Sequence, residues 1–427
     1  ACAASLAPQI DDIIGFYERC APLLTPTDSD ECLKGIARVV STLPPDRVLA
    51  ALQRMCAAPA AALQALVPQL QQLPPAPAPT APRTAAATQS AETAALIKQA
   101  VDAFHTMGSL LRNVNVDTTT AAAAAAPGAT HPVLSLMSAL WPTVAVPLFV
   151  AFHTLPDEVA YELCRFCRCA VTACGSEAAP MLEALLQAAT HAYARRPYPD
   201  VLYLANELLR VFGTNAQHTA VLMAGVQALC QATFAALQTP DACSWYPTIM
   251  QEFFDMLVRW VERLAPAILV VGSQPHQLAI ACVAYAVHLL PTAHNCLEGT
   301  RSSLVFVTRL LKAGKQLQQT DAVGALLAQT GYPLVHALLC CIGGRQPASL
   351  YADIRSVLTT LHRANAPALL TWLCFALSVA MPPDTAPVLL PAGLAQPYPL
   401  PFTIDAGAAQ VFIHDLFTAK RESQALS

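Results

Sequence analysis

Charged residues are scarce in this sequence of 427 residues. Asp, Glu, Lys and Arg make up 12% of it, against about 25% in an average domain. The net charge at pH 7 is −4, so acidic and basic residues nearly balance. Because bulk nucleic-acid binding needs a strongly basic surface, we predict no direct nucleic-acid partner.

Glycine and strand-like patterns are also sparse. The sequence has 16 glycines, and few stretches alternate β-branched and polar residues. No glycine-rich phosphate loop follows a strand, and the 11 histidines include no His-Glu-x-x-His pattern. We therefore expect no catalytic residue, no cofactor site and no metal site, and we predict that the chain is not an enzyme.

A secretory leader is not evident, because no charged segment precedes an apolar core and a cleavage site. The chain begins at Ala1 within a helix-like pattern, so we expect the natural protein to start further upstream. The 15 cysteines are an odd number without secretory context, which favours a reducing cytosol or nucleus over a disulfide framework.

Apolar, alanine-rich helical segments dominate what remains. The sequence is 55% hydrophobic and contains 35 prolines, a combination that predicts many helices separated by proline stops. Beyond the second low-complexity stretch, helices are predicted at 134–153, 154–175 or 157–175, 181–196, 201–212, 215–237, 247–264, 277–290, 301–317, 322–342, 350–364, 367–379 and 408–419.

These helices recur in pairs. Residues 132–175 and 176–213 each cover about forty residues, the period of HEAT or armadillo repeats. One such unit cannot bury its own apolar face, so neighbouring units stack into a continuous core. We predict an all-α fold, a HEAT-repeat α-solenoid that stacks antiparallel helix pairs.

Two low-complexity stretches divide the chain. The predicted order is HEAT-like helices at 1–73, a Pro/Ala/Thr linker at 74–90, a helix at 91–117, an Ala/Thr linker at 118–130, the solenoid at 131–419 and a tail at 420–427.

A polytopic membrane protein is one alternative. Residues 132–156, 265–291 and 365–383 are apolar and long enough to cross about 30 Å of hydrocarbon. Against this alternative, the segments contain prolines such as Pro142 and histidines such as His288, and their apolarity depends heavily on alanine. We therefore expect no membrane insertion.

The cysteines suggest zinc only superficially. Cys164-x-x-Cys167-x-Cys169, with Cys174 beyond, lies on one predicted helix, where Cys169 points away from the first two. No second Cys/His pair follows at the usual spacing. We interpret these thiols, and likewise the pair Cys340–Cys341, as small apolar side chains in helix contacts.

Two arginines on that helix allow two interpretations. Arg165 and Arg168 are three residues apart and share a face. They could form a solvated stripe paired with Glu158 or Glu162, or they could grip phosphate or carboxylate groups of a bound protein. Arg195 and Arg196 could extend such a patch, or could interact with a helix C-terminus. We take all four as candidate binding residues.

Several segments resemble one family when taken together and in order. They are CLKGIARVVSTLPPDR at 32–47, Leu140–Trp141–Pro142, the arginine- and cysteine-rich segment 164–175, VLYLANELLRVFG at 201–213, the spacing of Pro247, Phe254, Arg259 and Arg263, and Trp372–Leu373 with Leu377. Together they are similar to the transportin-SR branch of the importin-beta superfamily, and the chain resembles the C-terminal part of such a protein.

The resemblance implies a superhelical nuclear transport receptor that shuttles between cytoplasm and nucleus. Cargo of this branch includes Arg/Ser-repeat splicing factors, often phosphorylated, which the arginine-rich helix grips; Arg165 and Arg168 match that helix. It also implies binding to Phe/Gly nucleoporins, and cargo loading and release governed by Ran, mainly through N-terminal repeats that this chain lacks. Export remains an alternative direction to import, and a HEAT scaffold or adaptor unrelated to transport remains an alternative function.

Overall fold

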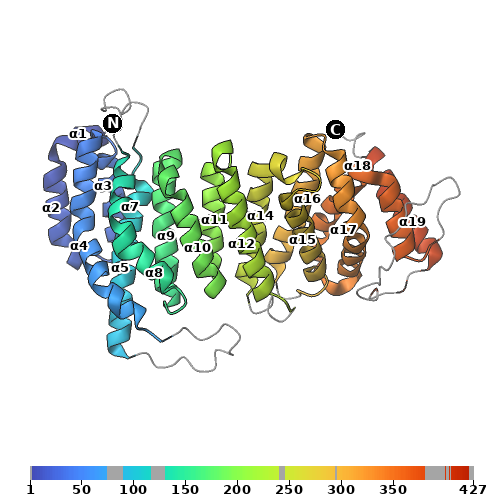
Figure 1. The fold of residues 1–427 in the computed structure, drawn as a ribbon, viewed down its shortest axis with the longest axis horizontal. Coiled ribbons are helices and arrows are strands. Elements are labelled where there is room, and N and C mark those ends of the chain that lie inside the picture. Colours follow the sequence, from blue (N-terminus) through green and yellow to red (C-terminus); the bar gives the residue numbers. More distant parts are fainter. Residues whose placement is uncertain are drawn as a thin grey trace. The chain divides into compact units, whose positions relative to one another are not determined.

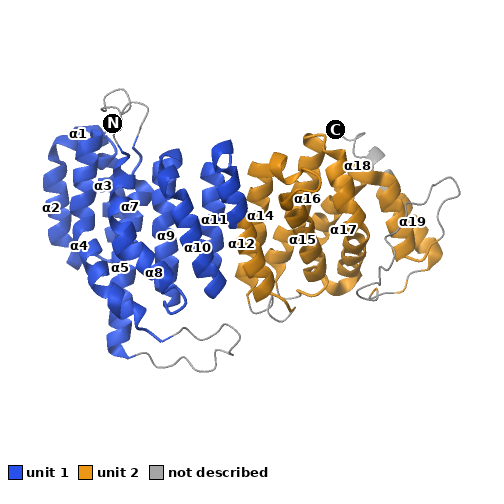
Figure 2. Ribbon diagram, in the orientation of Figure 1, with its two compact units in different colours: residues 1–225 blue, residues 226–427 orange. Residues whose placement is uncertain are grey.

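The computed structural model describes residues 2–74, 90–116, 130–239, 246–293, 296–379, 400, 403 and 405–422. Within these ranges every regular element is a helix. The chain divides into two compact units, residues 1–225 and 226–427 (Figure 2). The predicted linkers at 74–90 and 118–130 lie almost wholly outside the described residues. The predicted tail begins inside a helix, and its last five residues also lie outside them.

Unit 1 consists of helices that run side by side in two layers (Figure 1). After two short N-terminal helices, one layer places α3, α5, α9 and α11 next to one another, and the other places α4 beside α7 and α8, and α8 beside α10. Their bounds are α1 Cys2–Leu6, α2 Ile10–Cys20, α3 Pro26–Val40, α4 Pro45–Gln71, α5 Ala91–Asn113, α7 Pro132–Leu140, α8 Val146–Val150, α9 Asp157–Cys174, α10 Ala179–Arg195 and α11 Pro199–Phe212. Helix α12, Thr219–Ala236, crosses the boundary between the units.

Unit 2 repeats the same packing. Helices α14, α16 and α18 follow one another in one layer, and α15 packs on α17 in the other. Their bounds are α14 Pro247–Ile268, α15 Gln274–Leu289, α16 Leu297–Gln316, α17 Thr320–Cys340, α18 Tyr351–Ala376 and α19 Ala406–Glu422. In both units the helices of a layer therefore contact one another in order, and the two layers also pack on each other, as α4 does on α5 and α17 on α18.

Side-chain caps and a glycine set several helix ends. Thr25 accepts a hydrogen bond from the Asp28 backbone N–H at the start of α3, and Ser90 accepts one from Thr93 at the start of α5. Gly175 ends α9 with φ of +57°, a left-handed conformation that costs a glycine little. The predicted end of this helix at Gly175 is confirmed.

Two predicted boundaries are wrong for identifiable reasons. The helix predicted at 134–153 is interrupted by a π-helical turn, Trp141–Ala145, because Pro142 and Pro147 lack the N–H groups that a continuous α-helix requires. The helix predicted at 181–196 begins two residues earlier, at Ala179, directly after a short 3₁₀ turn, Gly175–Ala178.

The predicted break between residues 364 and 367 is present as a kink within α18. Asn365 has non-helical φ and ψ of −157° and 85°, and its side-chain oxygen accepts a hydrogen bond from the Ala368 N–H at 3.1 Å. Asn365 therefore caps the second half of α18, two residues before Pro367.

Three described helical stretches are long and apolar enough to cross a membrane, by length and composition alone. They are Pro132–Val150, Ala216–Ala236 and Thr320–Arg345. In the third stretch 72% of the apolar window is buried inside the protein, and in the first 50%. Packing between the layers therefore covers at least half of the apolar window in these two segments.

Candidate binding site around Arg165 and Arg168

Helix α9 carries the two arginines on a face that is otherwise polar or aromatic. Glu158, Tyr161, Arg165 and Arg168 follow at intervals of three or four residues, so they lie along one stripe. The opposite face is apolar and packs into unit 1. The predicted common face of Arg165 and Arg168 is confirmed, but their environments differ.

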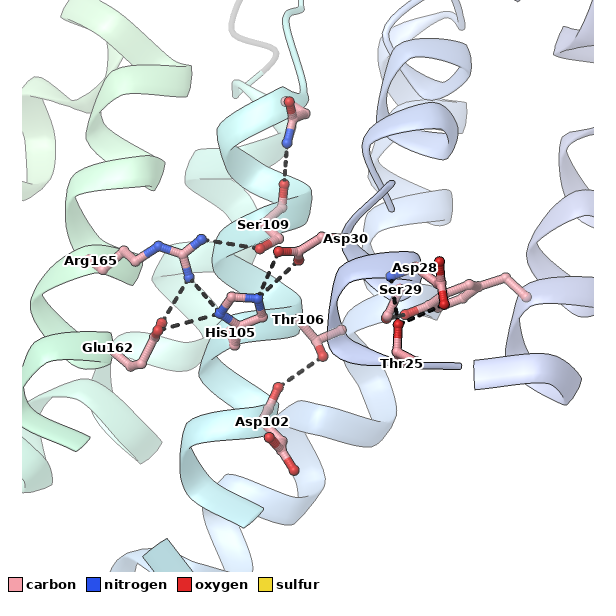
Figure 3. A network of polar contacts seen from close by, with 12 residues as sticks. Thr25, Asp28, Ser29, Asp30, Asp102, His105, Thr106, Ser109, Glu162 and Arg165 are labelled. Atoms are coloured by element: carbon pink, nitrogen blue, oxygen red, sulfur yellow. Dashed lines mark hydrogen bonds and ion pairs between the residues drawn. The ribbon is translucent and has the colours of Figure 1, made fainter. Parts of the chain in front are cut away.

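Arg165 belongs to a polar network that joins α3, α5 and α9 (Figure 3). Its Nη1 donates to Glu162 Oε2 at 2.9 Å, and its Nη2 donates to Ser109 Oγ at 3.1 Å. The same Nη1 lies 3.1 Å from His105 Nδ1. Arg165 is 8% exposed and Glu162 6%, so the pair is almost removed from solvent.

His105 connects this pair to α3. Its Nε2 lies 2.9 Å from Asp30 Oδ1, and its Nδ1 lies 3.4 Å from Glu162 Oε1. The hydrogen bond to Glu162 raises the pKa of His105, burial opposes the rise, and Asp30 adds to it. In the protonated ring both nitrogens donate, one to each carboxylate, while Arg165 Nη1 donates to the same Glu162 carboxylate.

Gly108 on α5 lies next to the Arg165 guanidinium. A Cβ atom at this position would lie 3.4 Å from Arg165 Nη1, close to the limit of van der Waals contact. The interpretation of a paired stripe describes Arg165 well, because its guanidinium already donates to Glu162 and Ser109.

Arg168 is placed differently. Its guanidinium carbon lies 3.9 Å from the centroid of the Tyr203 ring on α11, a cation–π arrangement. The Arg168 charge also opposes the rise in pKa that burial gives the Asp200 carboxyl. Within the described residues no hydrogen bond of the Arg168 guanidinium to another side chain is found, so its N–H donors remain available to a ligand.

Further side chains surround Arg168 that the sequence did not single out. Tyr203 is 37% exposed and Tyr161 41%. Burial raises the pKa of the Cys169 thiol, and the charges of Arg165, Arg168 and Arg112 oppose that rise. Arg112 of α5 therefore also lies within electrostatic range of Cys169. The stripe therefore combines exposed aromatic rings with cations, a combination suited to anionic side chains of a partner.

Arg195 and Arg196 lie at the N-terminal end of α9, where α8 and α10 end. Arg195 donates to the Val150 carbonyl at 3.1 Å, at the end of α8, and Arg196 donates to the Leu155 carbonyl and pairs with Asp157. Asp157 precedes Arg168 by eleven residues, or about 16 Å along the helix. The structure therefore does not bring these two arginines next to Arg168. The predicted interaction of Arg195 with a helix C-terminus does occur, and the helix is α8.

The cysteines of α9 are buried within the helix contacts. Burial raises the pKa of Cys164 well above the ordinary thiol value and that of Cys167 to about 12. Thiols that stay protonated at neutral pH are poor zinc ligands, since the thiolate binds the metal. Across the described ranges no group of three or more His, Cys, Asp or Glu side chains is placed to hold a metal ion.

Comparison with known proteins gives two findings. Residues 131–237 match the family model described as the Transportin-3/Importin-13 fourth TPR domain, a range that contains all four candidate arginines. A solved structure titled "Importin13 cytosolic state" matches with a TM-score of 0.74 at 16% sequence identity, covering 97% of this chain and 42% of that chain. The chain thus spans less than half the length of the importin-13 chain that it matches.

These findings confirm the family resemblance and the fold class. The stacked all-helical fold is that of importin-13 over nearly the whole chain, although the family description names its repeat TPR rather than HEAT. Both matches carry the names of transportin or importin proteins, which are karyopherins and not enzymes. Residues 131–237 are thus similar to the fourth TPR domain of transportin-3 and importin-13, and the chain as a whole has the fold of importin-13.

Proposed function

We propose that this chain is part of a nuclear transport receptor, which binds protein cargo and shuttles it between cytoplasm and nucleus. The observation that carries the proposal is the family match at residues 131–237, which includes α9 and its arginine stripe. In the whole receptor, cargo loading and release would depend on Ran, and passage would depend on Phe/Gly nucleoporins. We propose import as the direction.

Arg168 is the proposed cargo-contacting residue. Its guanidinium is held over Tyr203 but has N–H donors to spare, so it can donate to a phosphate or carboxylate without breaking an internal ion pair. Arg165, in contrast, would lose its bonds to Glu162 and Ser109 if it turned toward a ligand. We therefore propose that Arg165 positions α9 against α5, while Arg168 binds the anion.

Acidic or phosphorylated protein segments are the proposed cargo class, with phosphorylated Arg/Ser repeats the leading example. Such a segment presents phosphates in an extended chain, and guanidinium groups bind phosphates with strong charge-assisted hydrogen bonds. The exposed rings of Tyr161 and Tyr203 would contact the chain between the phosphates. Arg195 and Arg196 are proposed as a separate contact at the other end of α9.

A titration tests this function. The purified chain is titrated with a fluorescent Arg/Ser-repeat peptide, phosphorylated or not, at low and physiological salt. The expected result is phosphate-dependent, salt-sensitive binding that weakens about three- to tenfold in Arg168→Gln, the range for loss of one partly exposed charged contact. Exposed Arg38→Gln on α3 is the matched control and should bind as the wild type does.

Three results would contradict the proposal. Equal affinity for the two peptides would remove the phosphate dependence, and an unchanged Arg168→Gln affinity would remove the residue assignment. A folded chain that captures neither Phe/Gly repeats nor either peptide would favour the alternative of a scaffold unrelated to transport.

A further inference from the structure

An open groove runs between α16 and α18 in unit 2. Two adjoining hollows of about 330 and 270 Å³ form it, and both are lined by Lys312, Thr360 and Arg363. The two helices are neighbours in one layer of the unit. The groove is therefore a property of unit 2 alone.

Four cationic side chains line this groove. Lys312 and Lys315 come from α16, and Arg355 and Arg363 come from α18; all four are exposed. Neither hollow has an acidic or an aromatic residue in its lining. In a chain whose net charge is −4, the groove is a local concentration of positive charge.

Other arginines on the same helices have acidic partners. Arg301 of α16 lies 2.7 Å from Glu298 and 3.3 Å from Asp353, and Arg309 lies 3.9 Å from Glu262. For the four cations of the groove, the described part of the chain offers no such ion pair. Their charge is therefore not neutralised internally and is available to an external anion.

Both threonine hydroxyl groups in the groove are already engaged. Thr359 Oγ donates to the Arg355 carbonyl and Thr360 Oγ to the Ser356 carbonyl, each at 2.8 Å. Because these hydroxyl protons are used within α18, an anion in the groove would be held by the ammonium and guanidinium groups. Binding should consequently depend strongly on salt.

The dimensions suit an extended peptide. Arg355 and Arg363 are eight residues apart on α18, which corresponds to about 12 Å along a helix. An extended chain advances about 3.3 Å per residue, so three or four residues would span that distance. A polypeptide with acidic groups at this spacing would meet cations from both walls.

We propose that the groove between α16 and α18 binds an extended acidic segment of a partner protein, whose carboxylate or phosphate groups contact Lys312, Lys315, Arg355 and Arg363. A single-stranded nucleic acid fits less well, since the lining has no aromatic ring on which a base could stack. The proposal goes beyond the transport function and does not depend on it.

The test uses the full chain and two fluorescent peptides of about eight residues, long enough to cross the groove. One alternates Glu with Gly, and the other alternates phosphoserine with Gly. Arg355→Gln with Arg363→Gln should weaken binding about five- to thirtyfold, as expected for two exposed charge contacts. Lys312→Gln with Lys315→Gln removes the charge of the other wall and should give a similar loss.

A matched control variant carries two Arg→Gln substitutions outside the groove. Arg19→Gln with Arg38→Gln changes exposed arginines on α2 and α3 of unit 1 and should leave the affinity unchanged. Arg168→Gln removes the proposed cargo contact instead, and combining it with the groove variants separates the contributions of the two sites to the measured affinity. Thermal unfolding of each variant checks that the fold is intact.

The outcomes are distinguishable. Loss of either peptide in both groove variants, but not in the controls, supports the proposal, and the tighter peptide identifies the preferred anion. Binding of neither peptide by the folded wild type, or equal losses in the control variant, overturns it. Tighter binding of a single-stranded oligonucleotide, also weakened by the groove variants, would overturn the assignment to a protein partner.

Discussion

The guanidinium carbon of Arg168 lies 3.9 Å from the centre of the Tyr203 ring, one helix further along the same layer. A cation–π contact at a partly exposed site contributes about 0.5–1 kcal/mol and restricts the long arginine side chain. The ring thus fixes the direction in which Arg168 presents its N–H donors.

Tyr203→Leu should therefore weaken the binding of a phosphorylated Arg/Ser peptide. The expected loss is about two- to fivefold, because Arg168 regains rotational freedom that must be lost on binding. Tyr203→Phe keeps the ring and should bind as the wild type does. Fluorescence titration measures both; identical affinities for the Leu and Phe variants would show that the stacking does not organise Arg168.

Arg165→Met should lower stability rather than affinity. It leaves the Glu162 carboxylate, whose side chain is 7% exposed, without its closest cation. Removing one partner of such a pair costs about 3 kcal/mol, visible as a lower midpoint in thermal unfolding. The double variant Arg165→Met, Glu162→Gln removes the uncompensated charge and should recover part of the loss. If the double variant were no more stable than the single one, the ion pair would not be the cause.

His105 should make stability depend on pH. Its pKa is raised in the folded protein, so its contribution is fully present below the unfolded value of about 6.5 and is lost as the pH rises through the folded value. The effect should stay at or below about 1 kcal/mol because the His105 side chain is 36% exposed. Asp30, Glu162 and Arg165 are the charged groups that face it.

The measurement compares the midpoints of wild type and His105→Gln from about pH 5.5 to about pH 8.5. The wild-type advantage should shrink toward the alkaline end. His131 and His336 have pKa values that burial lowers, so their contributions have the opposite sign; they cancel in the difference between the two proteins. A difference that is constant across this range would contradict the assigned role of His105.

Gly331 should tolerate no side chain. A Cβ atom there would lie 2.2 Å from the Trp372 ring, where α17 packs on α18, so Gly331→Ala should destabilise unit 2 by about 1–3 kcal/mol. Gly324 lies on the same helix, and a Cβ atom at that position would meet no atom within 4 Å. Gly324→Ala should stabilise α17 by up to about 1 kcal/mol. Chemical denaturation of both variants tests the contact, and equal effects would contradict it.

The sequence predicted the helices well where a local signal marks their ends. The end of α9 at Gly175 and the kink of α18 at Asn365 are each marked by residues within one helical turn of the break. The π-helical turn at Trp141–Ala145 was missed, since Pro142 indicates an interruption without saying whether the chain breaks or bulges. The predicted linkers fall on residues that the structure does not describe, so they stay predictions.

The site was predicted in part, for a similar reason. The common face of Arg165 and Arg168 follows from their spacing, and so does the pairing of Arg165 with Glu162. The links from His105 to Asp30 and Glu162 join residues 75 and 57 positions apart, which no local pattern reveals.

The positions of the groove cations in the sequence are related by the repeat length. Lys312 and Arg355 are 355 − 312 = 43 positions apart, close to the repeat of about forty residues that places helices next to each other in one layer. Charges that recur at the repeat length are therefore predicted to meet across neighbouring helices.

The layered packing within each unit also has a consequence for how such chains grow. Each helix contacts the next of its layer one helix pair later in the sequence, so the loop that folding must close between them does not depend on how many pairs the stack contains. Adding another helix pair lengthens the protein without lengthening that loop. Duplication of a repeat therefore leaves the entropy of each closure almost unchanged, and receptors of this architecture can gain binding surface without becoming harder to fold.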